Sequence, residues 1–468
     1  MPLRWITTLL ILCETLAGES RLNEGLSDGE TVNDLKLVQL VFRHGDRAPF
    51  RVYKTDPYGK AIWTNGMGQL TRVGVKQHYD LGSFFRRRYH GFLNATNQAS
   101  EVYIRSSDQD RTLESAAAFA AGLIPADAST SWSKDELGQT WRPVPVHSVA
   151  WAEESLLYKE APCMEFKRLI NESSNLPEAR RLHKENRAVF DFVIKASGAD
   201  PSTMKTAMDE WEQLDFVYDV LTCQQAHELN LPPWLNGTVF LKMRELSNVF
   251  FHMKYGANGD RARARLGGGN LLDLIVDRMR DKGHAKAQEY LNKTKLFVYS
   301  GHDTTVAGLL ASLQLYNYSA NISNIGIPHY ASVVIIEQFQ NDSVRVSFKN
   351  DPLNIPTSEP KIVIPPGCPT TSSLCPLITL VEVTKPFRVE DVKKECRGPQ
   401  FGDNINVEDV SIALITVVLV IVLTTVALGC YKRKKSRRKA SADSGIENRS
   451  LIRPYARLED QEENEAAL

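Results

Sequence analysis

Several common signatures are missing from this 468-residue chain, and each absence narrows what the protein can be. The 56 basic and 56 acidic residues give a formal net charge of zero, so bulk charge indicates no nucleic-acid partner. The sequence has no zinc spacing of cysteine and histidine and no calcium loop, and it therefore implies no metal or other cofactor. The glycine triplet Gly267–Gly269 is not followed by Lys-Ser or Lys-Thr, so it predicts a turn rather than a phosphate-binding loop.

The most informative segment that is present is Arg43–Pro49, with the sequence Arg-His-Gly-Asp-Arg-Ala-Pro. It follows Leu37–Phe42, an apolar run whose length and composition predict a buried strand. Gly45 permits a sharp turn after that strand, and α/β folds keep their ligands at such strand ends. Two guanidiniums beside an imidazole predict an anion site around a histidine nucleophile. A solvated basic loop is the alternative interpretation.

Two further segments place polar side chains at the ends of predicted strands. Lys295–Tyr299 predicts a second buried strand, which ends at His302 and Asp303, and the apolar spacing from Thr304 onward predicts a helix. Arg105 ends a third strand-like run. Three strand ends that carry basic or acid–base groups predict a crevice at the carboxyl ends of the strands.

The rest of the pattern predicts an α/β core with a helical insertion. Asp108 and Asp110 are interpreted as caps of a helix that begins near Arg111. Residues from about 150 to 290 predict mostly helices, and the segment 332–348 predicts a β-hairpin.

These segments resemble the histidine acid phosphatases, specifically the animal lysosomal and prostatic type. Three segments carry the resemblance, with a weaker match at Gly68–Gly74: Arg43–Pro49, Val102–Thr112 and Ser300–Thr305. The resemblance covers Leu35 to Cys396. It implies an α/β fold of the phosphoglycerate-mutase type, with a central mixed, mostly parallel sheet flanked by helices.

The resemblance also implies an acid phosphatase that hydrolyses phosphate monoesters at low pH through a phosphohistidine. Carried over position by position, it makes His44 the nucleophile and Asp303 the proton donor. The implied phosphate-binding set is Arg43, Arg47, Arg105 and His302. A nucleophilic imidazole must be neutral, and nearby arginines are expected to lower the pKa of His44. The same arginines should lower the pKa of Asp303, whereas bound phosphate should raise it.

The resemblance implies disulfides Cys163–Cys396 and Cys368–Cys375. It also has a partner for Cys223 near the segment Pro328–Val333, but that segment contains no cysteine here. Cys223 is therefore predicted to be free or paired between chains.

The ends of the chain predict a single-pass type I membrane protein. We expect a signal peptide at residues 1–18, a catalytic domain at 35–396, a stalk at 397–409, a transmembrane helix at 410–430 and a cytosolic tail at 431–468. Basic residues that follow the apolar run place the tail in the cytosol and the catalytic domain in the lumen or outside the cell. Seven Asn-x-Ser/Thr triplets lie on the lumenal side, at Asn94, Asn171, Asn236, Asn292, Asn317, Asn321 and Asn341.

Two kinds of partner are expected besides phosphate monoester substrates. The resemblance implies a homodimer formed through Trp141–His147, although Trp141 could instead be a core residue. Tyr455–Leu458 and Glu447–Ile452 resemble sorting signals that adaptors bind, and they predict a lysosomal, endosomal or cell-surface location.

Two alternatives to a general acid phosphatase remain open at this stage. One is a type I receptor or adhesion ectodomain on the same scaffold, which an assay with an aryl phosphate would distinguish. The other keeps the chemistry but narrows the substrate to inositol phosphates or lysophosphatidate.

Overall fold

The computed structural model describes residues 31–94, 98–158, 163–256, 260–280, 293–316, 326–397 and 407–443. The chain divides into two compact units, Met1–Gly398 and Pro399–Leu468. The predicted signal peptide, most of the predicted stalk and both tail signals lie outside the described residues.

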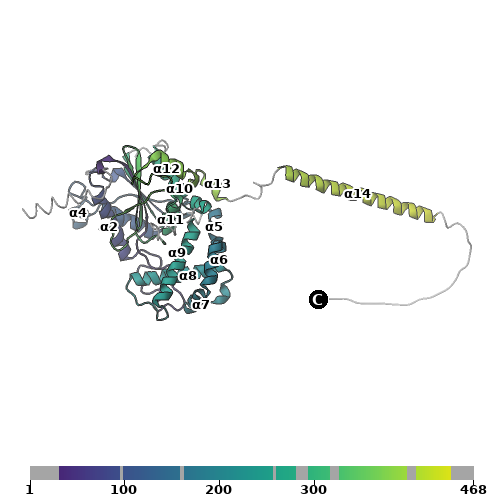
Figure 1. Cartoon of the computed structure of the whole chain (residues 1–468), viewed down its shortest axis with the longest axis horizontal. Coiled ribbons are helices and arrows are strands. Elements are labelled where there is room, and N and C mark those ends of the chain that lie inside the picture. The colour runs from purple at the N-terminus through teal and green to yellow at the C-terminus, as the bar shows by residue number, and fades with distance from the viewer. Residues whose placement is uncertain are drawn as a thin grey trace, which may run out of the picture. The chain divides into compact units, whose positions relative to one another are not determined.

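A mixed sheet forms the centre of the first unit (Figure 1). Its strands are β1 (Leu35–Arg43), β2 (Val102–Ser106), β3 (Val146–His147), β4 (Leu296–Gly301), β5 (Val333–Phe339), β6 (Ser343–Lys349), β7 (Lys361–Ile362) and β8 (Cys375–Pro376). Their order is β3-β2-β4-β1-β5-β6-β7, with β8 also paired to β6. The strands β1, β2, β3 and β4 run parallel, whereas β5 to β8 pair in antiparallel fashion. The predicted mixed α/β sheet and the hairpin β5–β6 are therefore confirmed.

Both faces of the central strands are buried, which is why their sequences are apolar runs rather than alternating ones. Leu37 and Val41 of β1 face a core shared with the helices α10 (Arg261–Met279) and α11 (Asp303–Ser312). Leu40 and Phe42 face a second core shared with α2 (Arg72–Arg88) and α3 (Asp110–Leu123). The strand is thus held in register by hydrophobic contacts on two sides.

The helices of the first unit cover the two faces of the sheet and form a separate group beside it (Figure 1). They are α2 (Arg72–Arg88), α3 (Asp110–Leu123), α4 (Glu136–Thr140), α5 (Met164–Asn171), α6 (Pro177–Glu185), α7 (Arg187–Ala196), α8 (Ala207–Ala226), α9 (Gly237–Tyr255), α10 (Arg261–Met279), α11 (Asp303–Ser312), α12 (Leu377–Thr384) and α13 (Val392–Cys396). The helices α7, α8 and α9 share small cores of their own. This group occupies the stretch where a helical insertion was expected.

The prediction of a turn at Gly267–Gly269 is wrong, because these residues lie inside α10. A Cβ atom on Gly268 would lie 1.9 Å from the carbonyl oxygen of Gly308 in α11. The glycines therefore allow α10 and α11 to pack backbone against backbone. This packing matters for the site, because α11 begins at Asp303.

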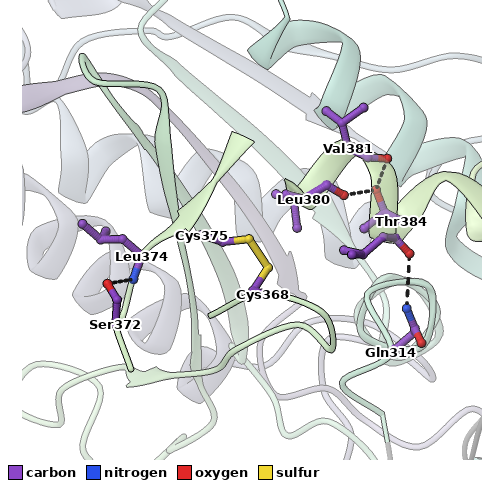
Figure 2. Close-up of a disulfide and its surroundings, with 9 residues drawn as sticks. Gln314, Cys368, Ser372, Leu374, Cys375, Leu380, Val381 and Thr384 are labelled. Carbon is purple, nitrogen blue, oxygen red and sulfur yellow. Dashed lines mark hydrogen bonds between the residues drawn. A yellow bond between two sulfur atoms is a disulfide. The ribbon is translucent and has the colours of Figure 1, made fainter. Parts of the chain in front are cut away.

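Both predicted disulfides are present, Cys163–Cys396 and Cys368–Cys375. The first ties residues near α5 to α13 at the end of the unit. The second closes a short loop before α12 (Figure 2). Cys223 is a free, buried thiol, in agreement with one of the two predicted outcomes.

The second unit contains the helix α14 (Val407–Asp443). Within it, Ile415–Lys435 is long and apolar enough to cross a membrane, with a mean hydropathy of 2.1. This stretch overlaps the segment 410–430 in which a transmembrane helix was predicted.

Candidate active site

Three parallel strands end side by side at one edge of the sheet, as the sequence predicted. The register pairs Arg43 of β1 with Gly301 of β4, and Ser106 of β2 with Ser300 of β4. The N–H of His44 donates to the carbonyl of Gly301 at 2.9 Å. The rings of His44 and His302 consequently lie 5.6 Å apart, measured between centroids.

Two glycines bring the loop after β1 against the start of α2. A Cβ atom on Gly45 would lie 2.4 Å from the carbonyl oxygen of Gly74, and one on Gly74 would lie 2.2 Å from that of Asp46. Thr71 caps α2 and donates its own N–H to the Asp46 carbonyl at 3.0 Å. Any side chain at either glycine would displace the backbone next to His44.

His44 is buried, with 2% of its surface exposed, and its protonation is fixed by its neighbours. Its Nδ1 lies 2.8 Å from the carbonyl oxygen of Gly45, which can only accept a hydrogen bond. In the neutral ring Nδ1 therefore carries the proton and Nε2 keeps its lone pair. Burial, followed by the charges of Arg43 and Arg111, holds the pKa of His44 well below its usual 6.5. The expected direction of this pKa shift is confirmed.

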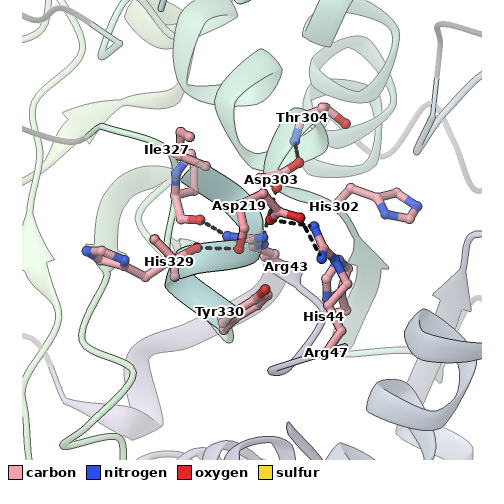
Figure 3. A network of polar contacts seen from close by, with 12 residues as sticks. Arg43, His44, Arg47, Asp219, His302, Asp303, Thr304, Ile327, His329 and Tyr330 are labelled. Atoms are coloured by element: carbon pink, nitrogen blue, oxygen red, sulfur yellow. Dashed lines mark hydrogen bonds and ion pairs between the residues drawn. The ribbon is translucent and has the colours of Figure 1, made fainter. Parts of the chain in front are cut away.

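Arg43, the last residue of β1, links this strand to the start of α11 (Figure 3). It forms a 2.9 Å ion pair with Asp303 and donates to the carbonyl of Pro328 at 2.6 Å. Its guanidinium also lies 4.1 Å from the centre of the Tyr330 ring. These contacts come from different segments and fix the guanidinium plane.

Arg47 is held by Asp219 of α8, which accepts two hydrogen bonds from its guanidinium at 3.0 and 3.2 Å (Figure 3). This paired geometry is the strong, directional form of an arginine–carboxylate contact. The helical group therefore contributes a residue to the site, and the sequence alone did not identify Asp219.

Arg105, the third arginine that was expected to bind phosphate, is paired with other residues of the protein. It pairs with the fully buried Glu154 at 2.7 Å and donates to the carbonyl of Ser106. Arg111 instead lies next to the two histidines, with one guanidinium nitrogen 3.4 Å from Nδ1 of His302. Arg105 lies within β2, before its end, whereas Arg111 is in the first turn of the helix that follows it. A residue just past the strand end reaches the crevice, and this position was the signal that could have identified Arg111.

Three guanidinium nitrogens in this site have no partner among the described residues. They are the buried Nε atoms of Arg43, Arg47 and Arg111. A buried N–H without a hydrogen bond is costly, and an oxyanion is a suitable acceptor for a guanidinium donor. Burial, followed by the charge of Arg47, lowers the pKa of Arg111 to about 10.

His302 is neutral, and its ring is oriented by Ser107, which lies between β2 and α3. Its Nε2 lies 2.9 Å from the hydroxyl of Ser107, which in turn lies 2.9 Å from that of Thr112. Burial, followed by the charge of Arg111, lowers the pKa of His302 to about 3. The Ser107–Thr112 pair thus sets the ring orientation.

Asp303 begins α11 and is ionised in the free protein. Burial by itself would raise its pKa, but the charges of Arg43 and Arg47 outweigh burial and hold the pKa below its usual value. The N–H of Thr304 donates to the same carboxylate at 2.8 Å. The two arginines therefore determine that the pKa of Asp303 is lowered in the free protein, a direction that the sequence alone left open.

Residues 34–349 match the histidine phosphatase superfamily (branch 2), and the chain belongs to this family. It is 35% identical to human lysosomal acid phosphatase over 83% of this chain and 87% of that protein. It is also 37% identical to rat lysosomal acid phosphatase over 78% of this chain and 80% of that one. Human prostatic acid phosphatase is 35% identical over 78% of this chain and 88% of its own length.

Solved structures confirm the fold. The phytase of Citrobacter braakii superimposes with a TM-score of 0.56 at 19% identity, covering 78% of this chain and 99% of that one. The Hafnia alvei phytase in complex with myo-inositol hexakis sulphate gives a TM-score of 0.56 at 16% identity, covering 78% of this chain and 99% of its own.

Proposed function

We propose that this protein is an acid phosphatase that hydrolyses phosphate monoesters through a phosphohistidine at His44. The observation that carries the proposal is a buried, neutral His44 whose Nε2 keeps its lone pair beside three arginines. The acid phosphatases named above, similar to this chain over most of their length, support it.

The reaction has two balanced steps. In the first step, Asp303 takes up the proton that the monoanionic ester brings, and the Nε2 lone pair of His44 forms a bond to phosphorus while the bond to the ester oxygen breaks. Asp303 gives that proton to the departing oxygen. In the second, water attacks the phosphohistidine and passes a proton to the Asp303 carboxylate, while the nitrogen–phosphorus bond breaks. The product is inorganic phosphate.

Phosphate binding is assigned to Arg43, Arg47, Arg111 and His302. The N–H donors of these side chains can stabilise the negative charge that spreads over the equatorial oxygens of the phosphoryl group in the transition state. Arg105, which the sequence placed in this set, is assigned a structural role because its guanidinium neutralises the buried Glu154.

The contacts of Arg111 and Arg105 predict that replacing the first lowers activity, whereas replacing the second lowers stability. Arg111→Ala should lower kcat/KM by about 10²–10³-fold with little change in melting temperature, because it removes a transition-state contact. Arg105→Ala should lower the melting temperature, because one unpaired partner of a buried ion pair costs about 3–5 kcal/mol. Steady-state kinetics and thermal unfolding of both variants measure the difference.

Glu154→Gln is the matched control and should reproduce the stability loss of Arg105→Ala. If Arg105→Ala weakens binding of inorganic phosphate at unchanged stability while Arg111→Ala does not, the original assignment of Arg105 is right.

The expected dependence of kcat/KM on pH follows from the protonation states of Asp303, His44 and the substrate. Asp303 is ionised in the free protein, so the proton it donates arrives with the substrate. A phosphate monoester has a second pKa of about 6 and is mostly a monoanion below it. His44 stays neutral in acid because its pKa is held low. We therefore expect kcat/KM to be nearly level from pH 4 to 5 and to fall as pH rises through about 6.

A panel of aryl, alkyl, inositol and lysophosphatidate esters, assayed from pH 4 to 8, tests the proposed function. Hydrolysis of several unrelated esters with the acidic profile is the expected result. Hydrolysis of the inositol or lysophosphatidate ester alone would indicate the narrower phosphatase. Hydrolysis of none would favour an ectodomain without enzymatic activity.

We also propose that the protein is a type I lysosomal membrane protein, with its catalytic domain at 35–396 in the lumen. The apolar stretch in α14 and the similarity to lysosomal acid phosphatases support this location. The predicted signal peptide (1–18), stalk (397–409), membrane segment (410–430) and tail (431–468) complete the domain order. Among the glycosylation triplets, Asn94, Asn171, Asn236 and Asn341 are exposed, whereas Asn292, Asn317 and Asn321 lie outside the described residues.

Delivery to lysosomes is assigned to the two tail signals, Tyr455–Leu458 and Glu447–Ile452. Replacing both Tyr455 and Leu451 by alanine should shift the protein toward the cell surface, as measured by surface labelling. An unchanged steady-state distribution would mean that the motifs are accidental.

A homodimer through Trp141–His147 is supported by the edge strand β3 and by exposed aromatic side chains. Trp141 is 39% and Trp132 is 55% exposed, which argues against a core role for Trp141. Together with Arg142 and Pro143 they line an open pocket of about 620 Å³. A second copy that covers this surface would bury the two indoles.

A further inference from the structure

Phe50 follows the Arg43–Pro49 segment directly and is exposed, yet it contacts two arginines of the site. Its side chain is 54% exposed. The guanidinium of Arg47 lies 4.1 Å from the centre of its ring, and that of Arg111 lies 4.9 Å away. These two arginines come from separate elements, the loop after β1 and the first turn of α3.

The loop that precedes α2 holds the ring in this place. A Cβ atom on Gly68 would lie 3.1 Å from the Phe50 ring, and Gly68 has a φ of +72°, which favours glycine. The N–H of Gly68 donates to the Pro49 carbonyl at 3.0 Å. The Gln69 side chain donates to Asp110 at 3.0 Å, which ties the same loop to the start of α3. The ring is therefore supported from both elements that carry the arginines.

The contact places one aromatic ring against two neighbouring guanidiniums. Two like-charged guanidiniums repel each other, and the negative face of an aromatic ring attracts both. Each of the two arginines has a buried Nε without a hydrogen-bond partner among the residues that the structure describes. Stacking on a ring fixes the guanidinium plane and so fixes the direction in which such donors point.

We propose that Phe50 is a positioning residue that aligns Arg47 and Arg111 for the phosphoryl group. This inference rests on the proposed function and deepens it, because it adds a residue that acts on phosphate through the two guanidiniums. Because the effect passes through the arginines, it does not depend on the ester's organic part. A residue that touched the leaving group would instead discriminate between esters.

The test compares binding of inorganic phosphate, measured by calorimetry and as competitive inhibition, in Phe50→Leu, Phe50→Tyr and the wild type. Leucine keeps apolar bulk but has no aromatic face, so affinity should fall about 5- to 30-fold. Tyrosine keeps the face and should restore affinity to within about 3-fold. Losses in kcat/KM should be equal for an aryl and an alkyl ester.

The control is Phe216→Leu, since Phe216 lies under Arg51 at 3.9 Å and makes the same kind of contact with an arginine outside the proposed phosphate-binding set. It should leave phosphate affinity unchanged. Unchanged phosphate affinity in Phe50→Leu, or a loss confined to aryl esters, would overturn the proposal. A wild-type protein that neither binds phosphate nor hydrolyses esters would instead overturn the proposed function, so the two failures are distinguishable.

Discussion

Replacing His44 by alanine is expected to lower kcat by roughly 10⁴–10⁶-fold on every phosphate ester, the scale seen when a covalent enzyme loses its nucleophile. The imidazole is the group that we assign to attack phosphorus, and the arginines around it can bind phosphate but cannot form the covalent intermediate. The loss should be the same for alkyl and aryl esters, because both pass through the phosphohistidine. Single-turnover kinetics with each ester measures it.

Two controls separate lost chemistry from lost structure. His90→Ala removes an exposed histidine and should leave kcat unchanged. His44→Ala should still bind inorganic phosphate, because the three arginines remain. A His44→Ala protein that folds normally and keeps more than a few per cent of wild-type turnover would contradict the assignment.

Replacing Asp303 by asparagine is expected to lower the phosphorylation rate by a factor that increases with the basicity of the leaving group. An alkyl phosphate expels a basic alkoxide, and its phosphorylation rate should fall about 10²–10⁴-fold. An activated nitrophenyl phosphate expels a stable phenoxide and should lose much less. The comparison needs single-turnover rates, because hydrolysis of the phosphohistidine is a later step common to both esters.

Arg111→Ala is the reference for this comparison, since charge on the equatorial oxygens is common to both esters and both should lose equally. Asparagine at position 303 also removes the ion pair with Arg43, so some loss on the activated ester is expected. Equal losses on the two esters in Asp303→Asn would mean that Asp303 positions Arg43 rather than donating a proton.

The sequence predicted the strand ends well because their signal is local. An apolar run followed by a glycine turn predicts a buried strand and its end, and β1 and β4 follow that pattern. Once the strands are parallel neighbours, the placement of His44 beside His302 follows from the register.

Contacts between distant segments could not be predicted in the same way. Gly267–Gly269 has the composition of a turn, but the close approach of α11 favours glycine inside a helix. Arg105 and Arg111 are both arginines near the end of β2, and only the burial of Glu154 shows which one is neutralised within the protein. Asp219 and Phe50 belong to no sequence motif. Their roles are evident only from the positions of α8 and of the loop before α2 in the folded protein.

The central claim is that the phosphoryl group is transferred to His44, and trapping the phosphohistidine tests this claim most directly. The protein is mixed with a ³²P-labelled aryl phosphate at acidic pH and quenched within milliseconds in alkali, where a phosphohistidine survives. Peptide mass spectrometry then locates the label. We predict label on Nε2 of His44 in the wild type, more of it at early times for an activated ester, and none in His44→Ala. Label on another residue, or hydrolysis with no labelled protein at any time, would contradict the account.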